Sequence, residues 1–252
     1  MNELDVLEIT WKVLIFHSFF TGFTQLLMTA PYGRYARAGY GITLNARFTW
    51  LVQECPSFLV PLFVTAYLGG NQWKAPNLVL LSMFLLHYFH RSFHYPFVIK
   101  GSKPVPLMIF VVSLIFCAIN GYMQSRYLLH YYSYTDQWFY DPRFIIGVVM
   151  FLFGMAINIH SDAILRGLRK PNETGYKIPK GGLFEFVSCA NYFGEALEWW
   201  GYCVACWSPP AMAFAVSTTC VLGTRALSHH KYYLQKMEDY PKDRKAFIPF
   251  IC

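Results

Sequence analysis

Seven apolar runs, each close to the roughly 20 residues that a helix needs to cross a bilayer, constrain this chain more than any other feature. They lie at about 8–30, 48–68, 76–98, 105–123, 144–164, 184–207 and 208–226. Only 14% of the 252 residues are charged, against about 25% in soluble domains. The sequence therefore predicts an all-α integral membrane protein, built as a seven-transmembrane helix bundle.

Lysine and arginine are distributed unevenly among the connections between these runs. They gather in the first, third and fifth connections and in the C-terminal tail, and they are sparse or offset by aspartate elsewhere. Because basic residues stay preferentially on the cytosolic side, this alternation predicts an N-terminus outside the cytosol and a cytosolic C-terminus. Most of the net charge of +7 then lies on one membrane face, where anionic lipid rather than nucleic acid is the expected partner.

Three of the runs carry polar residues at helical spacing. One helix face of the sixth run carries Asn191, Glu195, Glu198 and Tyr202. Similar faces on the fifth and seventh runs carry Asn158, Asp162, Arg166 and Arg169, and Arg225, His229 and Tyr233. A carboxylate in hydrocarbon costs roughly 2.5–3.5 kcal/mol on insertion scales, so each one needs a partner or a function. Interhelical hydrogen bonding is one interpretation, but so many ionisable groups favour a polar cavity that opens to the cytosol.

Two further features leave alternatives open. His87, His90 and His94 recur at i, i+3 and i+7, as metal ligands on one helix would, but no HxxHH box accompanies them and no metal is expected. Glu54 lies in an apolar run, where it either pairs with a neighbouring helix or stays neutral and donates a hydrogen bond. The chain contains no GxGxxG or P-loop motif, so the bundle itself must hold any nucleotide, without a Rossmann domain.

Several longer motifs are similar to those of one enzyme family. They are QECPS, LHYFHR, GMAINIHSDAILRGLRKP, GYKIPKGGLFEFVSCANYFGEALEWWGY, HHKYY and KAFIPFI. Through them the chain resembles the vertebrate steroid 5-alpha-reductases from about Gln53 to its end. NGYMQSRYL and ETGYKIP are more similar to the type 1 isozyme than to type 2, and apolar Val112 stands where type 2 has an arginine.

This resemblance implies NADPH-dependent reduction of the 4,5 double bond of 3-oxo-4-ene steroids, such as testosterone or progesterone, by hydride transfer to C5. It also implies a multi-pass protein of the endoplasmic reticulum membrane with a lumenal N-terminus, and a monomer is expected. We expect one membrane domain over residues 1–252, with largely substrate-side elements in about 1–100 and largely cofactor-binding elements in about 101–252.

The resemblance assigns expected roles to individual residues. Glu54 and Tyr88 match family positions that hold the steroid 3-oxo group, and they are the expected catalytic residues. The positions that match cofactor-binding residues are Arg91, Tyr95, Lys103, Asn158, Asp162, Arg169, Tyr176, Asn191, Glu195, Arg225, His229 and Tyr233. Glu195 is thereby expected to hydrogen-bond the cofactor, whereas Glu198 has no expected ligand.

Three alternatives share parts of these patterns. Related membrane reductases of enoyl-CoA or polyprenol substrates have a similar C-terminal half, but QECPS and HYFHR favour a steroid substrate. A membrane methyltransferase of similar architecture would bind a different nucleotide. A lipid-binding protein without enzymatic activity would need no NADPH.

Asn172 should carry no glycan, although Asn172-Glu-Thr is the only glycosylation sequon of the chain. It lies in the fifth connection, which the distribution of basic residues places in the cytosol, away from the glycosylation machinery. Enzymatic deglycosylation should leave the electrophoretic mobility of the native protein unchanged. A mobility shift that Asn172→Gln abolishes would contradict the predicted orientation.

Overall fold

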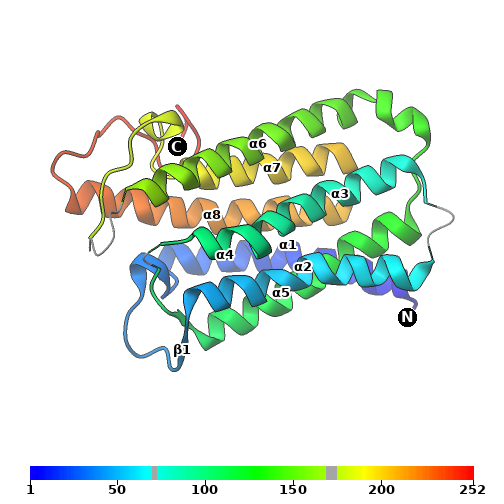
Figure 1. The fold of residues 1–252 in the computed structure, drawn as a ribbon, viewed down its shortest axis with the longest axis horizontal. Helices are drawn as coiled ribbons and strands as arrows, with labels where there is room; N and C mark the ends of the chain where they lie inside the picture. Colours follow the sequence, from blue (N-terminus) through cyan, green and yellow to red (C-terminus); the bar gives the residue numbers. More distant parts are fainter. Residues whose placement is uncertain (70–72, 101, 169–174) are drawn as a thin grey trace.

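The protein is a bundle of helices that run along its long axis. The computed structural model describes residues 1–69, 73–100, 102–168 and 175–252. In Figure 1 successive long helices alternate in direction, and the N-terminus lies at one end of the bundle, opposite the C-terminal segment. The α-helices are α1 Glu3–Leu27, α2 Ala46–Leu68, α3 Ala75–Phe89, α4 Tyr95–Val98, α5 Leu107–Arg126, α6 Pro142–Gly167, α7 Ala190–Cys206 and α8 Pro209–Lys236.

Short elements complete the described part of the chain. The two-residue strands β1 Thr43–Leu44 and β2 Val105–Pro106 pair antiparallel. The 3-10 turns are η1 Gly33–Tyr35, η4 Asp136–Tyr140 and η5 Gly182–Glu185. Two π-helical turns, η2 His90–His94 and η3 Tyr127–Tyr131, continue α3 and α5. The expected all-α membrane fold is therefore confirmed.

Five of the described helices are long and apolar enough to cross a membrane: α1, α2, α5 with η3, α6 and α8. The third predicted run corresponds to α3, η2 and α4, which continue one another from Ala75 to Val98. The sixth corresponds to α7, which has 17 residues, fewer than the roughly 20 that a span requires. The count of seven spans stays a prediction.

Helix α7 begins at Ala190, later than the apolar run from about 184 indicates. The residues just before it pair instead with the C-terminal tail. Ser188 N donates to Lys245 O at 2.8 Å, and Lys245 N donates to Phe186 O at 2.8 Å. Buried Arg244 donates to Pro179 O at 2.8 Å and to Glu185 at 3.2 Å. The tail thus holds the segment that leads into α7.

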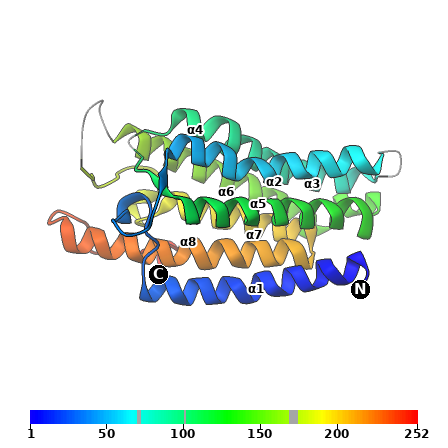
Figure 2. The same ribbon diagram turned by 90° about the horizontal axis from the view of Figure 1, so that it is seen from below.

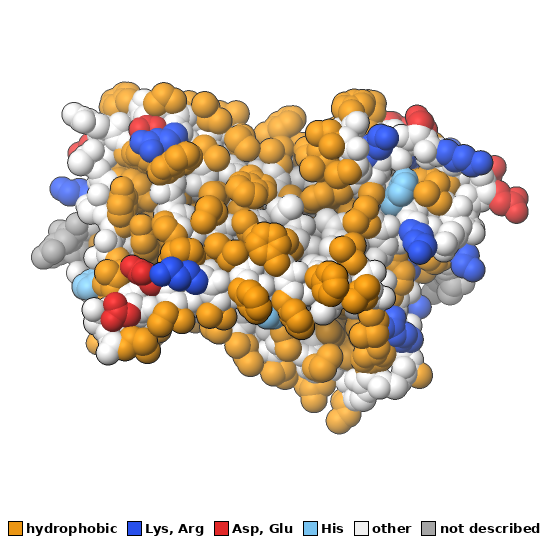
Figure 3. Space-filling model, turned by 180° about the vertical axis from the view of Figure 1, so that it is seen from behind, with side chains coloured by type: hydrophobic (Ala, Val, Ile, Leu, Met, Phe, Trp, Pro, Cys, Tyr) orange, Lys and Arg blue, Asp and Glu red, His pale blue; other side chains and the backbone are white. Residues whose placement is uncertain are grey.

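The two ends of the bundle differ in charge. Among the described residues, the connections after α1, α4 and α6 and the tail after α8 lie at one end (Figures 1 and 2), and these are the segments rich in Lys and Arg. Toward the other end, three basic residues pair with carboxylates, in Lys12–Glu8 at 3.1 Å, Arg143–Asp141 at 2.8 Å and Arg126–Glu3, and the connection after α2 carries the single exposed Lys74 among its described residues. Figure 3 shows the predominantly apolar surface between the ends. This asymmetry is the one that the positive-inside rule describes.

Glycines bring α6 and α7 into close contact. Gly147 and Gly154 on α6 face Gly194 and Gly201 on α7, and the spacing is seven residues on each helix. A Cβ atom added to Gly194 would lie 2.6 Å from Asn158 N and 2.9 Å from Gly154 O, so only glycine fits. Small residues allow this backbone approach in membrane bundles, where packing rather than hydrophobicity drives helix association.

Helix α1 packs against α8 on one side of the bundle (Figure 2) and is fixed to α5 at its start. The Glu3 carboxylate accepts hydrogen bonds from Arg126 Nε at 2.6 Å and from Tyr131 Oη at 2.7 Å, and it also accepts from Tyr122. Arg126 is buried, so this contact neutralises a charge that would otherwise lie unpaired in the bundle.

Gly194→Ala should destabilise the protein, whereas Gly167→Ala should not. The added methyl group at position 194 would overpack the α6–α7 contact, which typically costs about 1–3 kcal/mol. Nothing lies within 4 Å of a Cβ added at Gly167, near the end of α6. Thermal unfolding in detergent should show a lower midpoint for Gly194→Ala alone. Equal midpoints for the two variants would contradict the proposed close packing.

Candidate functional site

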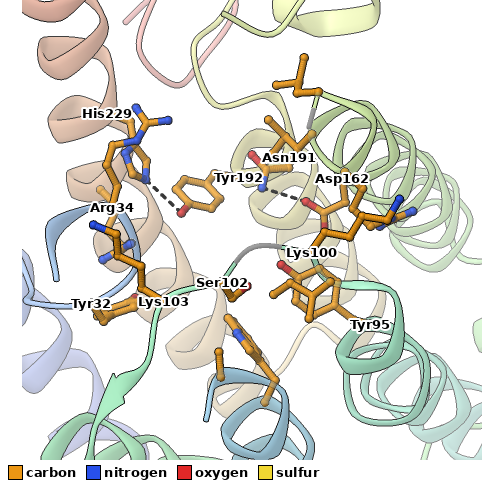
Figure 4. Close-up of a pocket in the computed structure, with 18 of the residues that line it drawn as sticks. Tyr32, Arg34, Tyr95, Lys100, Ser102, Lys103, Asp162, Asn191, Tyr192 and His229 are labelled. Atoms are coloured by element: carbon orange, nitrogen blue, oxygen red, sulfur yellow. Dashed lines mark hydrogen bonds between the residues drawn. The ribbon is translucent and has the colours of Figure 1, made fainter. Parts of the chain in front are cut away.

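A cavity of about 320 Å³ opens among the helices at the basic end of the bundle. Its volume lies within the roughly 300–1,000 Å³ of small-molecule sites. Figure 4 shows Asp162, Asn191 and Tyr95 on one side of it and Arg34, Lys103 and Tyr32 on the other. Ten of the residues predicted to bind a cofactor line this cavity: Arg91, Tyr95, Lys103, Asp162, Tyr176, Asn191, Glu195, Arg225, His229 and Tyr233.

One wall of the cavity is a network of amides and carboxylates from α6 and α7. Asn191 Nδ2 donates to Asp162 Oδ1 at 3.0 Å, as drawn in Figure 4. Asn158 is buried behind this wall, where its Nδ2 donates to Asn191 O at 2.9 Å and to Glu195 Oε2 at 3.3 Å. Asn158 therefore orients two lining residues without itself lining the cavity.

Arg91 connects this wall to α2 and α4. Its guanidinium lies 3.6 Å from the Asp162 carboxylate and 3.8 Å from the Glu195 carboxylate. The same group lies over the rings of Trp50 and Tyr95, at 4.9 and 4.5 Å from their centroids. Arg91 belongs to the π-helical turn η2, a type of turn that is frequent at functional sites. The Arg91 guanidinium thus offsets the charge of both carboxylates.

The opposite wall is basic and aromatic. Arg225 lies 3.9 Å from the ring centroid of Tyr32. Arg34 lies over the rings of Tyr176 and Tyr233, at 4.4 Å from each, and donates to Tyr233 Oη at 2.8 Å. Arg34 Nε, Arg34 Nη1 and Arg225 Nη1 are buried and have no hydrogen-bond partner within the described part of the protein. Unpaired guanidinium donors in a cavity suit an anionic ligand.

His229 fastens the first connection to the helices. Tyr35 Oη lies 3.1 Å from His229 Nδ1, and Tyr192 Oη lies 3.4 Å from His229 Nε2. The Tyr35 and His229 rings stack at 5.2 Å. Burial raises the pKa of Tyr35 to about 12, so its phenol keeps its proton at neutral pH. The turn η1 is thereby held over the cavity.

Glu54 and Tyr88 do not line this cavity. Glu54, on α2, is half-buried; its carboxylate accepts from Gln53 at 3.3 Å and lies 3.8 Å from Cys117 Sγ. Tyr88, on α3, is buried, and its side chain lies within electrostatic reach of Glu54. Arg91, which lines the cavity, follows Tyr88 by three residues along the continuous helical segment α3–η2.

The predicted sets differ from the observed cavity in several residues. Arg169 lies outside the described residues. The three histidines do not meet at one point. His90 and His94 stack with ring centroids 4.9 Å apart, whereas His87 contacts Glu198. No group of three potential metal ligands occurs among the residues described. Lys100, one of the basic residues expected to meet phosphates, also lines the cavity. Lining residues that the sequence did not single out include Tyr32, Arg34, Trp50 and Tyr192.

Two comparisons place this site in a family. Residues 103–252 match the family model described as 3-oxo-5-alpha-steroid 4-dehydrogenase. The chain is 56% identical over 230 residues to 3-oxo-5-alpha-steroid 4-dehydrogenase 1 of Bos taurus, and the match covers 89% of each. It is 53% identical to the type 1 enzyme of Homo sapiens, over 87% of this chain and 85% of that protein. The type 2 enzyme of Homo sapiens is 51% identical, over 82% of each. On these matches the chain belongs to the 3-oxo-5-alpha-steroid 4-dehydrogenase family.

Proposed function

We propose that the protein reduces the 4,5 double bond of 3-oxo-4-ene steroids with NADPH, by hydride transfer to C5. The observation that supports this most strongly is the cavity, with one wall of amides and carboxylates and one of arginines, inside an apolar bundle. Relatives named 3-oxo-5-alpha-steroid 4-dehydrogenase share about half of its residues. The basic end then faces the cytosol from the endoplasmic reticulum membrane, and the N-terminus lies in the lumen.

The residues of the cavity fit NADPH. Arg34 and Arg225 have buried nitrogens without a partner among the residues that the structure describes, and these offer donors to phosphate oxygens; Lys103 adds a further positive charge. Asp162, Asn191 and Glu195 on the other wall can hydrogen-bond ribose hydroxyls and an amide. When bound, NADPH supplies the hydride. Asn158 and Arg91 hold these acidic side chains in place from behind and from the side.

The steroid would lie next to Tyr88, where the bundle is apolar. Phe84 and Phe214 pack around the Tyr88 ring, with centroids at 4.8 and 6.4 Å. Hydride addition at C5 moves negative charge through C4 onto the 3-oxo oxygen. A hydrogen-bond donor at that oxygen stabilises the transition state. The Tyr88 phenol can donate directly, and Glu54 can donate or orient Tyr88.

NADPH should be strongly preferred over NADH, because the basic wall can neutralise the additional 2′-phosphate. Purified protein with testosterone or progesterone should show a higher kcat/KM for NADPH than for NADH. Oxidation of either cofactor is followed by its absorbance. Equal values for the two cofactors would contradict the assignment of the basic wall.

Arg34→Gln should weaken NADPH binding by about 10- to 100-fold, since a hydrogen bond to a charged group contributes about 1.5–3 kcal/mol. Arg37→Gln is the matched control, because exposed Arg37 contacts Tyr40 and Thr29 O and does not line the cavity. Fluorescence titration of NADPH measures both dissociation constants. Similar affinities in the two variants would remove Arg34 from the binding site.

Tyr88→Phe and Glu54→Leu should each slow steroid reduction by on the order of 10² to 10³, as loss of an oxyanion donor does. Neither residue lines the cavity, so NADPH affinity should change by no more than a few-fold. Glu54→Gln keeps a donor and should be less impaired than Glu54→Leu. Single-turnover hydride transfer at saturating NADPH measures the effect. Rates close to wild type in both Tyr88→Phe and Glu54→Leu would exclude these residues from the reaction.

A further inference from the structure

A histidine and a glutamate form a buried contact between α3 and α7, outside the cavity. His87 Nδ1 lies 2.8 Å from Glu198 Oε1, and their side chains are 5% and 0% exposed. Glu198 Oε2 is buried without a hydrogen-bond partner among the described residues. Neither residue lines the cavity. The proposed contacts with cofactor and steroid therefore leave this pair without a role.

The pair is one of two polar contacts between the same chain segments. One turn closer to the basic end, Arg91 of η2 lies 3.8 Å from Glu195 of α7. His87 precedes Arg91 by four residues, and Glu198 follows Glu195 by three, as expected for antiparallel helices. The Arg91 contact lies at the cavity wall, whereas the His87 contact lies in the apolar interior. Together they connect α3 and its continuation η2 to α7 at two successive levels.

The same contact fixes the surroundings of Tyr88. The His87 ring lies 4.5 Å from the Trp199 ring and 5.1 Å from the Tyr88 ring. Trp199 follows Glu198 on α7 and lies 5.9 Å from Tyr88, and both rings are buried. Two consecutive residues on α3 thus pack against two consecutive residues on α7. A shift of α3 would move the Tyr88 phenol relative to the cavity wall on α7.

Stability alone gives a weak reason for such a pair. Removing two ionisable side chains from water is costly, and replacing a buried pair by apolar residues is often neutral or even stabilising. One Glu198 oxygen has no hydrogen-bond partner in the described part of the protein, which adds to the cost. A role in geometry explains why these side chains occupy the interior.

We propose that His87 and Glu198 are positioning residues, which hold α3 in register on α7 and so set the distance from the Tyr88 hydroxyl to the cofactor bound against Asn191 and Glu195. This inference rests on the proposed function. It requires no proton transfer by either residue. It assigns the pair to the rate of hydride transfer and leaves NADPH affinity to the cavity walls.

The test replaces both members at once, because a single substitution would leave one partner buried and unpaired. The variants are His87→Leu/Glu198→Leu and, with a different distribution of volume, His87→Phe/Glu198→Ala. Folding is followed by thermal unfolding, NADPH binding by fluorescence titration, and reduction by single-turnover rates at saturating NADPH.

For the double variants we expect NADPH affinity within about threefold of wild type and a hydride-transfer rate at least about tenfold lower, with little change in steroid KM. The single variant Glu198→Gln keeps the volume and a hydrogen bond to His87. Its hydride-transfer rate should therefore stay within about threefold of wild type.

Several results would overturn the proposal. The first is a wild-type hydride-transfer rate in either folded double variant. The second is a parallel loss of NADPH affinity and rate. The third is failure of both double variants to fold, which would assign the pair to folding. A loss above about 100-fold in Glu198→Gln would show that the carboxylate itself reacts. If wild type binds NADPH but reduces no steroid, the proposed function fails instead, and that result is read before any variant is compared.

Discussion

The close approach of α6 and α7 is the constraint on which the site depends. Gly154 and Gly194 allow backbone contact between the helices, and a Cβ atom at either position would clash with the facing helix. This contact places Asp162 of α6 within hydrogen-bond distance of Asn191 of α7. Asn158 reaches across to Glu195 in the same way. Without this contact between α6 and α7, the two carboxylates would lose their amide partners and would keep only the Arg91 guanidinium to offset the cost of their burial.

Helix α7 contacts both the cavity proposed for the cofactor and the surroundings of Tyr88, where the steroid is proposed to lie. Glu195 faces the cavity, and Trp199, about one turn later, packs against Tyr88 on α3. The connection after α1 supplies the opposing positive charge through Arg34, and His229 and Tyr233 hold that connection in place. In the described part of the chain, helix faces and one loop thus form the cavity proposed to hold the nucleotide, where other reductases use a Rossmann domain.

The sequence predicted the parts of the site that follow helical periodicity. Asp162, Asn191 and Glu195 lie on predicted faces because a spacing of four residues returns to the same side of a helix. Arg34 and Tyr35 belong to a connection without such periodicity, so no helical spacing could place either side chain at the site. The partner of Glu198 lies 111 residues away on another helix, and no local pattern could identify it. Similarly, the late start of α7 depends on pairing with Lys245, which only the folded chain brings close.

The most direct test of the account is the fate of the hydride. Purified protein is incubated with testosterone and NADPH deuterated at C4 of the nicotinamide, and the steroid product is analysed by NMR and mass spectrometry. The proposed reaction gives a saturated 3-oxosteroid with deuterium at C5 and a solvent-derived hydrogen at C4. Absence of turnover, or deuterium at C4 rather than C5, would contradict it.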